Sequence, residues 1–309
     1  MDEIEKIENN WNTSSVEKGN ELYNLGKKEV KNSQIQKKCF EDAIFFYLES
    51  NDDICFCNLA HCYFLLARLF NVNTHEYYRK SIEYHIKGSK KKKYQHEDFY
   101  KFYVVDESNI SSILKNIRLT KPSEFNDPTD CPIAQDGINE SLFPEKNVFD
   151  GLRVCSFGCI KGNNKAWEDG GKWAYYGGGN KGICIRYRFF NNVIEKKLTD
   201  KFVFGEVKYT EKFDFYRGIV ADGFLSKSKC FSNENEWRII CYDRNNKDEY
   251  IHLPIRKDNI YQIFLGYRCS DSIKETVLEF AKSGSNIIPV MKIHPDINNV
   301  FKLTSTRIN

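Results

Sequence analysis

DFYKFYVVDESNISSILKNIRLTKPSEFNDPTD, residues 98–130, marks the point at which the chain changes its hydrophobic period. Its first part, Phe99–Val104, is a short run of aromatic and β-branched residues, which is typical of a strand. Apolar side chains then recur at helical spacing over Ser108–Asn116. The segment closes at Asn126–Pro128, where proline fixes φ and the Asn and Asp side chains can cap nearby amides. The stretch therefore predicts a strand, a helix and a tight turn.

Short apolar runs separated by glycine and asparagine clusters continue towards the C-terminus. Besides Phe99–Val104, we expect strands at Leu152–Phe157, Gly182–Tyr187, Phe202–Tyr209, Glu236–Tyr242, Ile260–Gly266 and Ile287–Ile293. Helical patterns fit between them at about Lys165–Tyr176 and Ser272–Ser283. Because the elements do not alternate as βαβ units, we expect residues 94–309 to form one mixed α+β domain.

Upstream, residues 14–88 predict helices, because apolar side chains recur at three- and four-residue steps. Two helical hairpins are similar to each other at about the register of a tetratricopeptide repeat. Small residues at the close-packing positions would let the helices approach, namely Gly26, Ala60, Ala43 and Ser81. Two repeats are fewer than a free-standing array needs, so we expect the module, residues 1–93, to pack on the α+β domain. It would recruit a protein target or regulator.

The run Ser89–Lys93, SKKKK, marks the boundary between the two parts. A solvated linker is the favoured interpretation and a phosphate-contacting patch the alternative. A chain of 309 residues, 41% hydrophobic and 29% charged, agrees with two globular domains. The net charge of only +3 permits a nucleic-acid partner without indicating one.

The sequence favours a reduced, cytoplasmic location without a membrane partner. The first ten residues are rich in acidic side chains and lack the apolar run of a secretory signal. The longest apolar stretch, Leu59–Phe70, is interrupted by His61 and Arg68 and is much shorter than the roughly 20 residues of a bilayer span. Eleven scattered cysteines indicate free thiols.

No metal site is expected from the cysteines. The group Cys55, Cys57 and Cys62, with His61 beside it, does not have the paired spacing of a zinc knuckle. Cysteine is also one of the most commonly buried residue types. Packing is therefore the expected role of these side chains.

An ordered set of motifs resembles a bacterial family, the domain of unknown function numbered 2971. The motifs are the quoted segment, LRVCSFG, KWAYYGGGNKGICIRY, KSKCFSNENEWRII and IFLGYR. The resemblance covers residues of about 98–267. It implies no defined chemistry.

The same blocks resemble, more weakly, the split-sheet fold of ADP-ribosyltransferases. In that fold a first strand bears His or Arg, and Lys101 stands at the corresponding position. A second strand ends in Tyr or Ser plus an aromatic, as Ser156-Phe157 does. A glutamate opens the last motif, which Glu236 matches. The resemblance implies an enzyme that splits NAD, with a role as a toxin or phage-defence effector.

The chemistry that this resemblance implies needs a carboxylate beside the ribose. Cleavage of the nicotinamide–ribose bond develops an oxocarbenium ion, which a carboxylate such as Glu236 stabilises. Glu234 lies two residues earlier, so on an extended strand it would face the same side and orient the acceptor. Catalytic roles are thus expected for Glu236, Glu234 and Ser156. Contacts to NAD are expected from Lys101, Tyr103, Tyr175, Tyr176 and Phe157.

Each of these residues also has an ordinary structural interpretation. The two glutamates could be exposed strand residues paired with Lys227, Lys229 or Arg238, and Ser156 could be a serine at the edge of the core. Lysine replaces the His or Arg of known transferases, which favours a competing hypothesis, a binding module without catalysis. The run Gly177–Gly179 lacks the pattern of a phosphate loop and predicts a helix exit. A nuclease or a thiol or serine hydrolase has less support, because no acidic metal cluster or nucleophile motif is evident.

Overall fold

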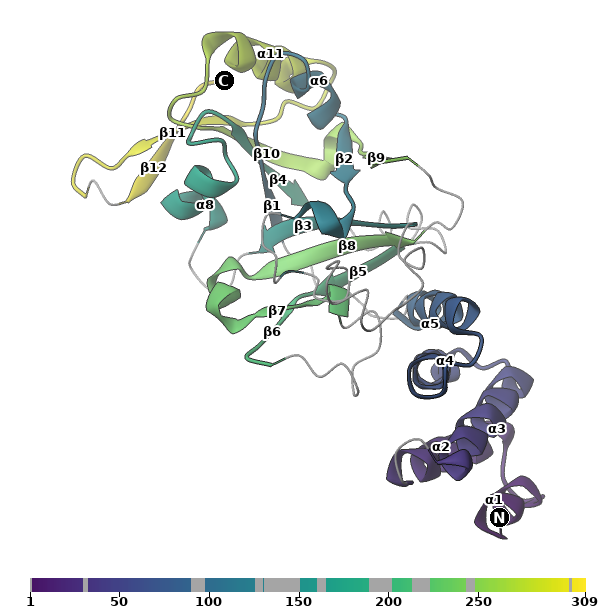
Figure 1. Ribbon diagram of the computed structural model, residues 1–309. Coiled ribbons are helices and arrows are strands. Elements are labelled where there is room, and N and C mark those ends of the chain that lie inside the picture. The colour runs from purple at the N-terminus through teal and green to yellow at the C-terminus, as the bar shows by residue number, and fades with distance from the viewer. Residues whose placement is uncertain are drawn as a thin grey trace.

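The computed structural model describes residues 2–29, 33–89, 98–125, 130, 151–159, 165–188, 202–212, 223–242, 248–299 and 302–309. Over these ranges the chain is a mixed α+β protein, as expected (Figure 1). The lysine run Lys90–Lys93 and the turn expected at Asn126–Pro128 lie outside the described residues.

The N-terminal part is helical. Its elements are α1 (Asp2–Glu8), α2 (Ser15–Lys28), α3 (Gln34–Ser50), the short 3₁₀-helix η1 (Asp53–Cys55), α4 (Phe56–Phe70) and α5 (Thr74–Ser89). Ser14 and Glu17 form a capping box that starts α2, and Ser33 caps α3. Asn51 and Asn71 end α3 and α4 in the left-handed conformation that asparagine tolerates. α2 packs on α3 and α4 on α5, so the helices pair as hairpins, while their tetratricopeptide register stays a prediction.

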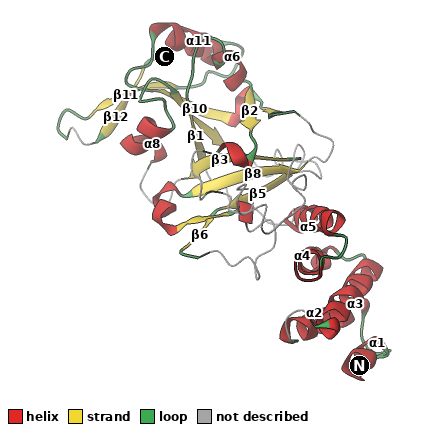
Figure 2. Ribbon diagram, viewed as in Figure 1, coloured by secondary structure: helices red, strands yellow, loops and turns green. Residues whose placement is uncertain are grey.

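A large sheet dominates the remainder (Figure 2). Its described strands follow the order β12-β11-β10-β4-β1-β3-β8-β5, and every neighbouring pair is antiparallel except β10 and β11. The strands are β1 (Asp98–Tyr103), β3 (Leu152–Cys159), β4 (Ile183–Arg188), β5 (Phe202–Glu206), β8 (Glu236–Tyr242), β10 (Ile260–Leu265), β11 (Val290–Pro295) and β12 (Leu303–Arg307). Six of the seven expected strands overlap one strand each, and the seventh, expected at Phe202–Tyr209, is divided between β5 and a short strand, β6 (Lys208–Thr210), of another sheet.

Two smaller sheets were not expected from the sequence. One pairs β2 (Asn116–Leu119) with β9 (Ile251–Pro254), and the other pairs β6 (Lys208–Thr210) with β7 (Ser226–Ser228). The expected helix over 108–116 is wrong in length, because α6 covers only Ile110–Ile113 and the chain then enters β2. The other elements are η2 (Pro122–Glu124), η5 (Ala166–Glu168), α8 (Gly170–Tyr175), η6 (Lys229–Glu234), η7 (Lys257–Asn259) and α11 (Asp271–Lys282).

The helix expected over 165–176 is interrupted at Asp169. This residue has extended backbone angles and its carboxylate accepts from the amides of Gly171 and Lys172, so it ends η5 and caps α8. The run Gly177–Gly179 follows Tyr176, the C-cap of α8, and both Gly178 and Gly179 have positive φ. The glycines thus form a helix exit, as the sequence indicated.

The helical module and the sheet share one hydrophobic core. One face of β3 and β8, with side chains Leu152, Val154, Ile240 and Tyr242, joins the same buried cluster as the helices. The opposite face packs against a second core that includes α11 and α6. The helices therefore pack on the α+β domain, as their small number led us to expect.

Candidate functional site

A pocket of about 640 Å³ opens where β1 and β3 separate. The β1–β3 ladder ends at Tyr100↔Gly158, and further along the same edge of β3 an isolated bridge joins Val154 to Thr120, just beyond β2. Between these two contacts the edge of β3 faces the pocket. The volume is within the roughly 300–1,000 Å³ of small-molecule sites.

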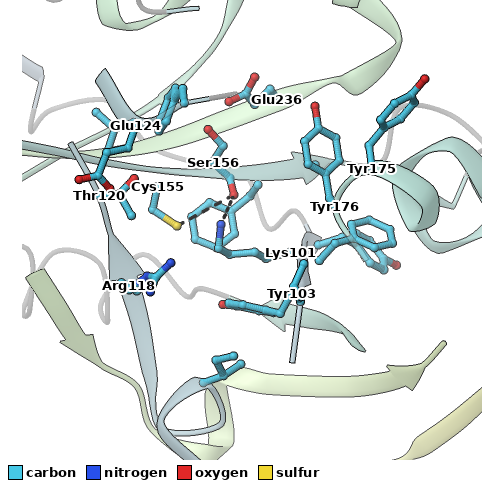
Figure 3. Close-up of a pocket in the computed structure, with 18 of the residues that line it drawn as sticks. Lys101, Tyr103, Arg118, Thr120, Glu124, Cys155, Ser156, Tyr175, Tyr176 and Glu236 are labelled. Carbon is cyan, nitrogen blue, oxygen red and sulfur yellow. Dashed lines mark hydrogen bonds between the residues drawn. The ribbon is translucent and has the colours of Figure 1, made fainter. Parts of the chain in front are cut away.

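All eight candidate site residues of the sequence line this pocket. They are Lys101, Tyr103, Ser156, Phe157, Tyr175, Tyr176, Glu234 and Glu236. Figure 3 labels all of them except Phe157 and Glu234. The eight residues come from β1, β3, the end of α8 and the adjacent elements η6 and β8, so four separate segments of the chain meet here. The fold thus brings residues from separate parts of the chain around one pocket.

The ammonium group of Lys227 is surrounded by three carboxylates on the wall of the pocket. Its Nζ lies 2.7 Å from Glu234 Oε2, 3.0 Å from Asp130 Oδ2 and 3.4 Å from Glu236 Oε2. Burial alone would lower the pKa of Lys227, but the charges of Glu236, Asp130 and Glu234 raise it above the usual value. The lysine is therefore a permanent cation that holds the acidic groups together.

Arg238 fixes the carboxylate of Glu236 from the other side. Its Nε donates to Glu236 Oε1 at 2.7 Å and its Nη2 to Oε2 at 3.1 Å, while Nη2 also contacts Asp130. Burial would raise the pKa of Glu236, but the charges of Arg238 and Lys227 and hydrogen bonds from Arg238 and Ser156 hold it at about 2. Glu236 is thus ionised at neutral pH although only 4% of its surface is exposed. The structural interpretation of Glu236 as a glutamate paired with Lys227 or Arg238 agrees with these contacts. Its expectation that Glu236 is exposed is wrong, because the side chain is buried.

Glu234 contacts Lys227 from a 3₁₀-helix and not from the extended strand that was expected. It is the last residue of η6, and Asn235 comes next with φ of 45°, so Glu234 and Glu236 do not share an extended strand. Their carboxylates meet because both contact Lys227. Tyr176 donates its hydroxyl to Glu234 Oε1 at 2.8 Å, and burial together with this bond raises the pKa of Tyr176. Lys229, the other proposed partner, pairs with Glu211 instead.

Ser156 and Glu236 lie on the same face of the sheet. Ser156 pairs with Arg238 and Gly158 with Glu236 in the β3–β8 ladder, and alternate residues of a strand share a face. Both side chains line the pocket. Tyr209 supports Glu236 from behind, because its hydroxyl accepts from the Glu236 amide at 2.8 Å. Ser156 is therefore a half-buried serine that lines the pocket, between the buried residues Cys155 and Phe157.

Lys101 enters the pocket from the other face of the sheet. Its Nζ donates to the carbonyl of Ser156 at 3.2 Å and lies near the rings of Tyr103 and Phe157. Both aromatic residues belong mainly to the core, because both side chains are buried. The Tyr103 hydroxyl also shares a buried hydrogen bond of 2.8 Å with that of Tyr187. By contrast, Tyr175 is 81% exposed and offers a free ring face at the pocket mouth.

Some lining residues were not found from the sequence. Asp130 ends the segment that decides the fold, but nothing in its surroundings indicated that it would meet Lys227 and Arg238. Arg118 falls just after a stretch that predicted a helix, whereas it lies on β2 and contributes to the pocket. The guanidinium of Arg118 lies over the ring of Tyr250, which directly precedes β9.

The cysteine group considered for zinc belongs to the helices. Cys55 and Cys62 are buried, Cys57 is exposed, and His61 Nδ1 lies 2.6 Å from the Tyr23 hydroxyl. Burial raises the pKa of Cys62. Among the described residues there is no group of three or more His, Cys, Asp or Glu side chains arranged to hold a metal. None of the described helices combines the length and apolar character needed to cross a membrane.

No family model, curated protein or solved structure matches this chain.

Proposed function

We propose that this pocket binds NAD and that its carboxylates promote cleavage of the nicotinamide–ribose bond. The observation that carries the proposal is the meeting of Ser156, Glu236, Tyr175 and Tyr176 around one pocket at a split in the sheet. A catalytic cleft requires such convergence, whereas independent surface residues do not. The helical module would hold a protein target or regulator.

The reaction assigns distinct tasks to the acidic residues. The glycosidic electron pair leaves with nicotinamide, and positive charge develops on the ribose carbon and ring oxygen. Glu236 stabilises that charge, and its pKa of about 2 suits this task because the group stays ionised. Glu234 is less buried and bonded to Tyr176, so it orients the acceptor, which forms the new bond to the ribose carbon and loses a proton.

The aromatic pair serves the flat end of the ligand. Tyr175 is exposed at the pocket mouth and can stack on the nicotinamide ring, while Tyr176 is tied to Glu234. Ser156 lies on the same face of the sheet as Glu236 and contributes to the polar wall of the pocket beside it. Water or a macromolecular nucleophile both satisfy the role of acceptor.

The test measures nicotinamide release from NAD by the full chain, with and without cell lysate. Glu236→Gln keeps the size of the side chain but removes its charge, and we expect the rate to fall by roughly 100-fold or more. Glu211→Gln, an exposed glutamate away from the pocket, is the matched control and should leave the rate unchanged. Release that is equal in wild type and Glu236→Gln would refute the assigned role.

One observation favours a second candidate, a binding module without catalysis. Arg238 binds both oxygens of Glu236, and Lys227 lies beside them, so the negative charge is already compensated. A compensated carboxylate stabilises an oxocarbenium ion less than a free one. Saturable NAD binding without nicotinamide release, in a folded chain supplied with lysate, would support this candidate over the enzyme.

A further inference from the structure

The pocket has a second end, away from the acidic cluster of Asp130, Glu234 and Glu236 around Lys227. The proposed reaction assigns no role to this end. It is built by α6, β2 and the segment around β9, and Arg118, Tyr250 and His252 line it. Figure 3 places Ser156 and Lys101 between Arg118 and Glu236. A ligand longer than one ring would therefore extend from the acidic cluster past Lys101 to Arg118.

The cations at the two ends differ in what they already bind. At the acidic end, Lys227 and Arg238 each contact two or more carboxylates. Away from that end, Lys101 donates to the Ser156 carbonyl and Arg118 stacks on Tyr250, and neither forms a salt bridge with a carboxylate of the described residues. Glu124 also lines the pocket, and its charge and that of Arg118 both act on Tyr250. An anionic group would thus meet three carboxylates at the acidic end and, away from it, the cations Lys101 and Arg118, neither of which has a salt bridge among the described residues.

Arg118 is held in a position suited to an anion. Its guanidinium lies 4.4 Å from the centre of the Tyr250 ring, and such stacking orients the group without using its N–H donors. Burial raises the pKa of the Cys155 thiol, and the charges of Lys101 and Arg118 both oppose that rise, so both cations act on one region. The planar fork of arginine suits the paired oxygens of a phosphate group.

We propose that Arg118, together with Lys101, binds the pyrophosphate of an ADP-ribosyl ligand, which directs the nicotinamide end of NAD towards Glu236. This assignment rests on the proposed function for the identity of the ligand. It adds the orientation of the substrate and a binding residue on β2. These two cations, rather than a glycine loop, supply the phosphate affinity.

The experiment measures calorimetric binding of ADP-ribose and of adenosine, which has no phosphate, to the full chain and to Arg118→Gln. Loss of a charged, forked contact should weaken ADP-ribose binding roughly 10-fold or more and leave adenosine binding unchanged. Arg268→Gln is the matched control, because Arg268 is exposed and does not line the pocket. Thermal unfolding of both variants verifies that they fold.

The outcomes separate this proposal from the proposed function. Weaker ADP-ribose binding in Arg118→Gln supports the phosphate assignment, even if the wild type releases no nicotinamide and the enzyme hypothesis fails. Equal ADP-ribose binding by Arg118→Gln and wild type overturns the assignment, even if NAD is cleaved. Absence of ADP-ribose binding by the wild-type chain also overturns it.

Discussion

Arg238 and Glu236, two positions apart on β8, are joined by a hydrogen bond of 2.7 Å from Nε to Oε1. The guanidinium is fully buried, and it also donates to the carbonyl of Phe224 at 2.7 Å and contacts Asp130. Phe224 belongs to the core that the sheet shares with the helices. The same arginine therefore connects the pocket acid to the core beneath the helical module.

Removing this arginine should destabilise the whole chain. In Arg238→Met the carboxylates of Glu236 and Asp130 lose a buried partner, and breaking a buried ion pair from one side costs about 3–5 kcal/mol. Denaturant unfolding of wild type and variant measures the difference. Lys229→Met is the control, because the Lys229–Glu211 pair is exposed on both sides and such pairs contribute about 0–1 kcal/mol. A similar loss in both variants would contradict a special role for Arg238.

The low pKa of Glu236 predicts how stability depends on pH. Its folded value of about 2 is below the unfolded value of 4.5, so the ionised form stabilises the fold. That contribution, about 3 kcal/mol by linkage, is present above pH 4.5 and decreases as the pH falls towards 2. The free energy of unfolding of wild type should therefore exceed that of Glu236→Gln most at about pH 5–7, and the difference should shrink in acid.

The control for this titration is Glu211→Gln, which removes an exposed carboxylate. Its difference from wild type should stay small across the same pH range. A constant difference between wild type and Glu236→Gln down to about pH 3 would mean that the carboxylate is not held in its ionised form by the fold.

The strands could be predicted from the sequence because each carries enough apolar residues to show its period. β8, Glu236–Tyr242, was predicted with its observed bounds. β2 was missed because its four residues come after a run with helical spacing, and only pairing with β9, more than 130 residues later, makes it extended. Local pattern contains no signal for such a distant partner.

Part of the candidate site could be predicted because its residues lie on strands that show their apolar period in the sequence. Ser156 and Glu236 lie on recognisable strands, so their meeting agreed with the expected order of elements. Asp130 contacts Arg238 across 108 positions, and the sequence around it gives no indication of that contact. The i, i+2 argument for Glu234 failed because the left-handed backbone of Asn235 interrupts the strand. Glu234 and Glu236 do line the same pocket, but through their common contact with Lys227 and not through a shared strand.

The shared core predicts that the helices and the sheet unfold together. Ile240 lies on the face of β8 that joins the helical cluster, and it is 3% exposed. Ile240→Ala should cost about 2–5 kcal/mol and shift the loss of helix and the change in tryptophan fluorescence by the same amount. Ile297→Ala, at a site that is 94% exposed, is the control. Two separate transitions, with only one moved by Ile240→Ala, would show that the parts are independent.

The helix pairing makes a last prediction at Gly26. A Cβ atom there would lie 2.8 Å from Phe40 Cε1 and 3.0 Å from Cys39 Cβ, closer than side chains approach without displacement. Alanine favours a helix over glycine by about 1 kcal/mol, but overpacking of a buried contact costs about 1–3 kcal/mol. Gly26→Ala should therefore lower the free energy of unfolding. Gly170→Ala, at the first position of α8 with no atom within 4 Å, should be neutral or stabilising. Stabilisation by both changes would mean that α2 and α3 are not in close contact at Gly26.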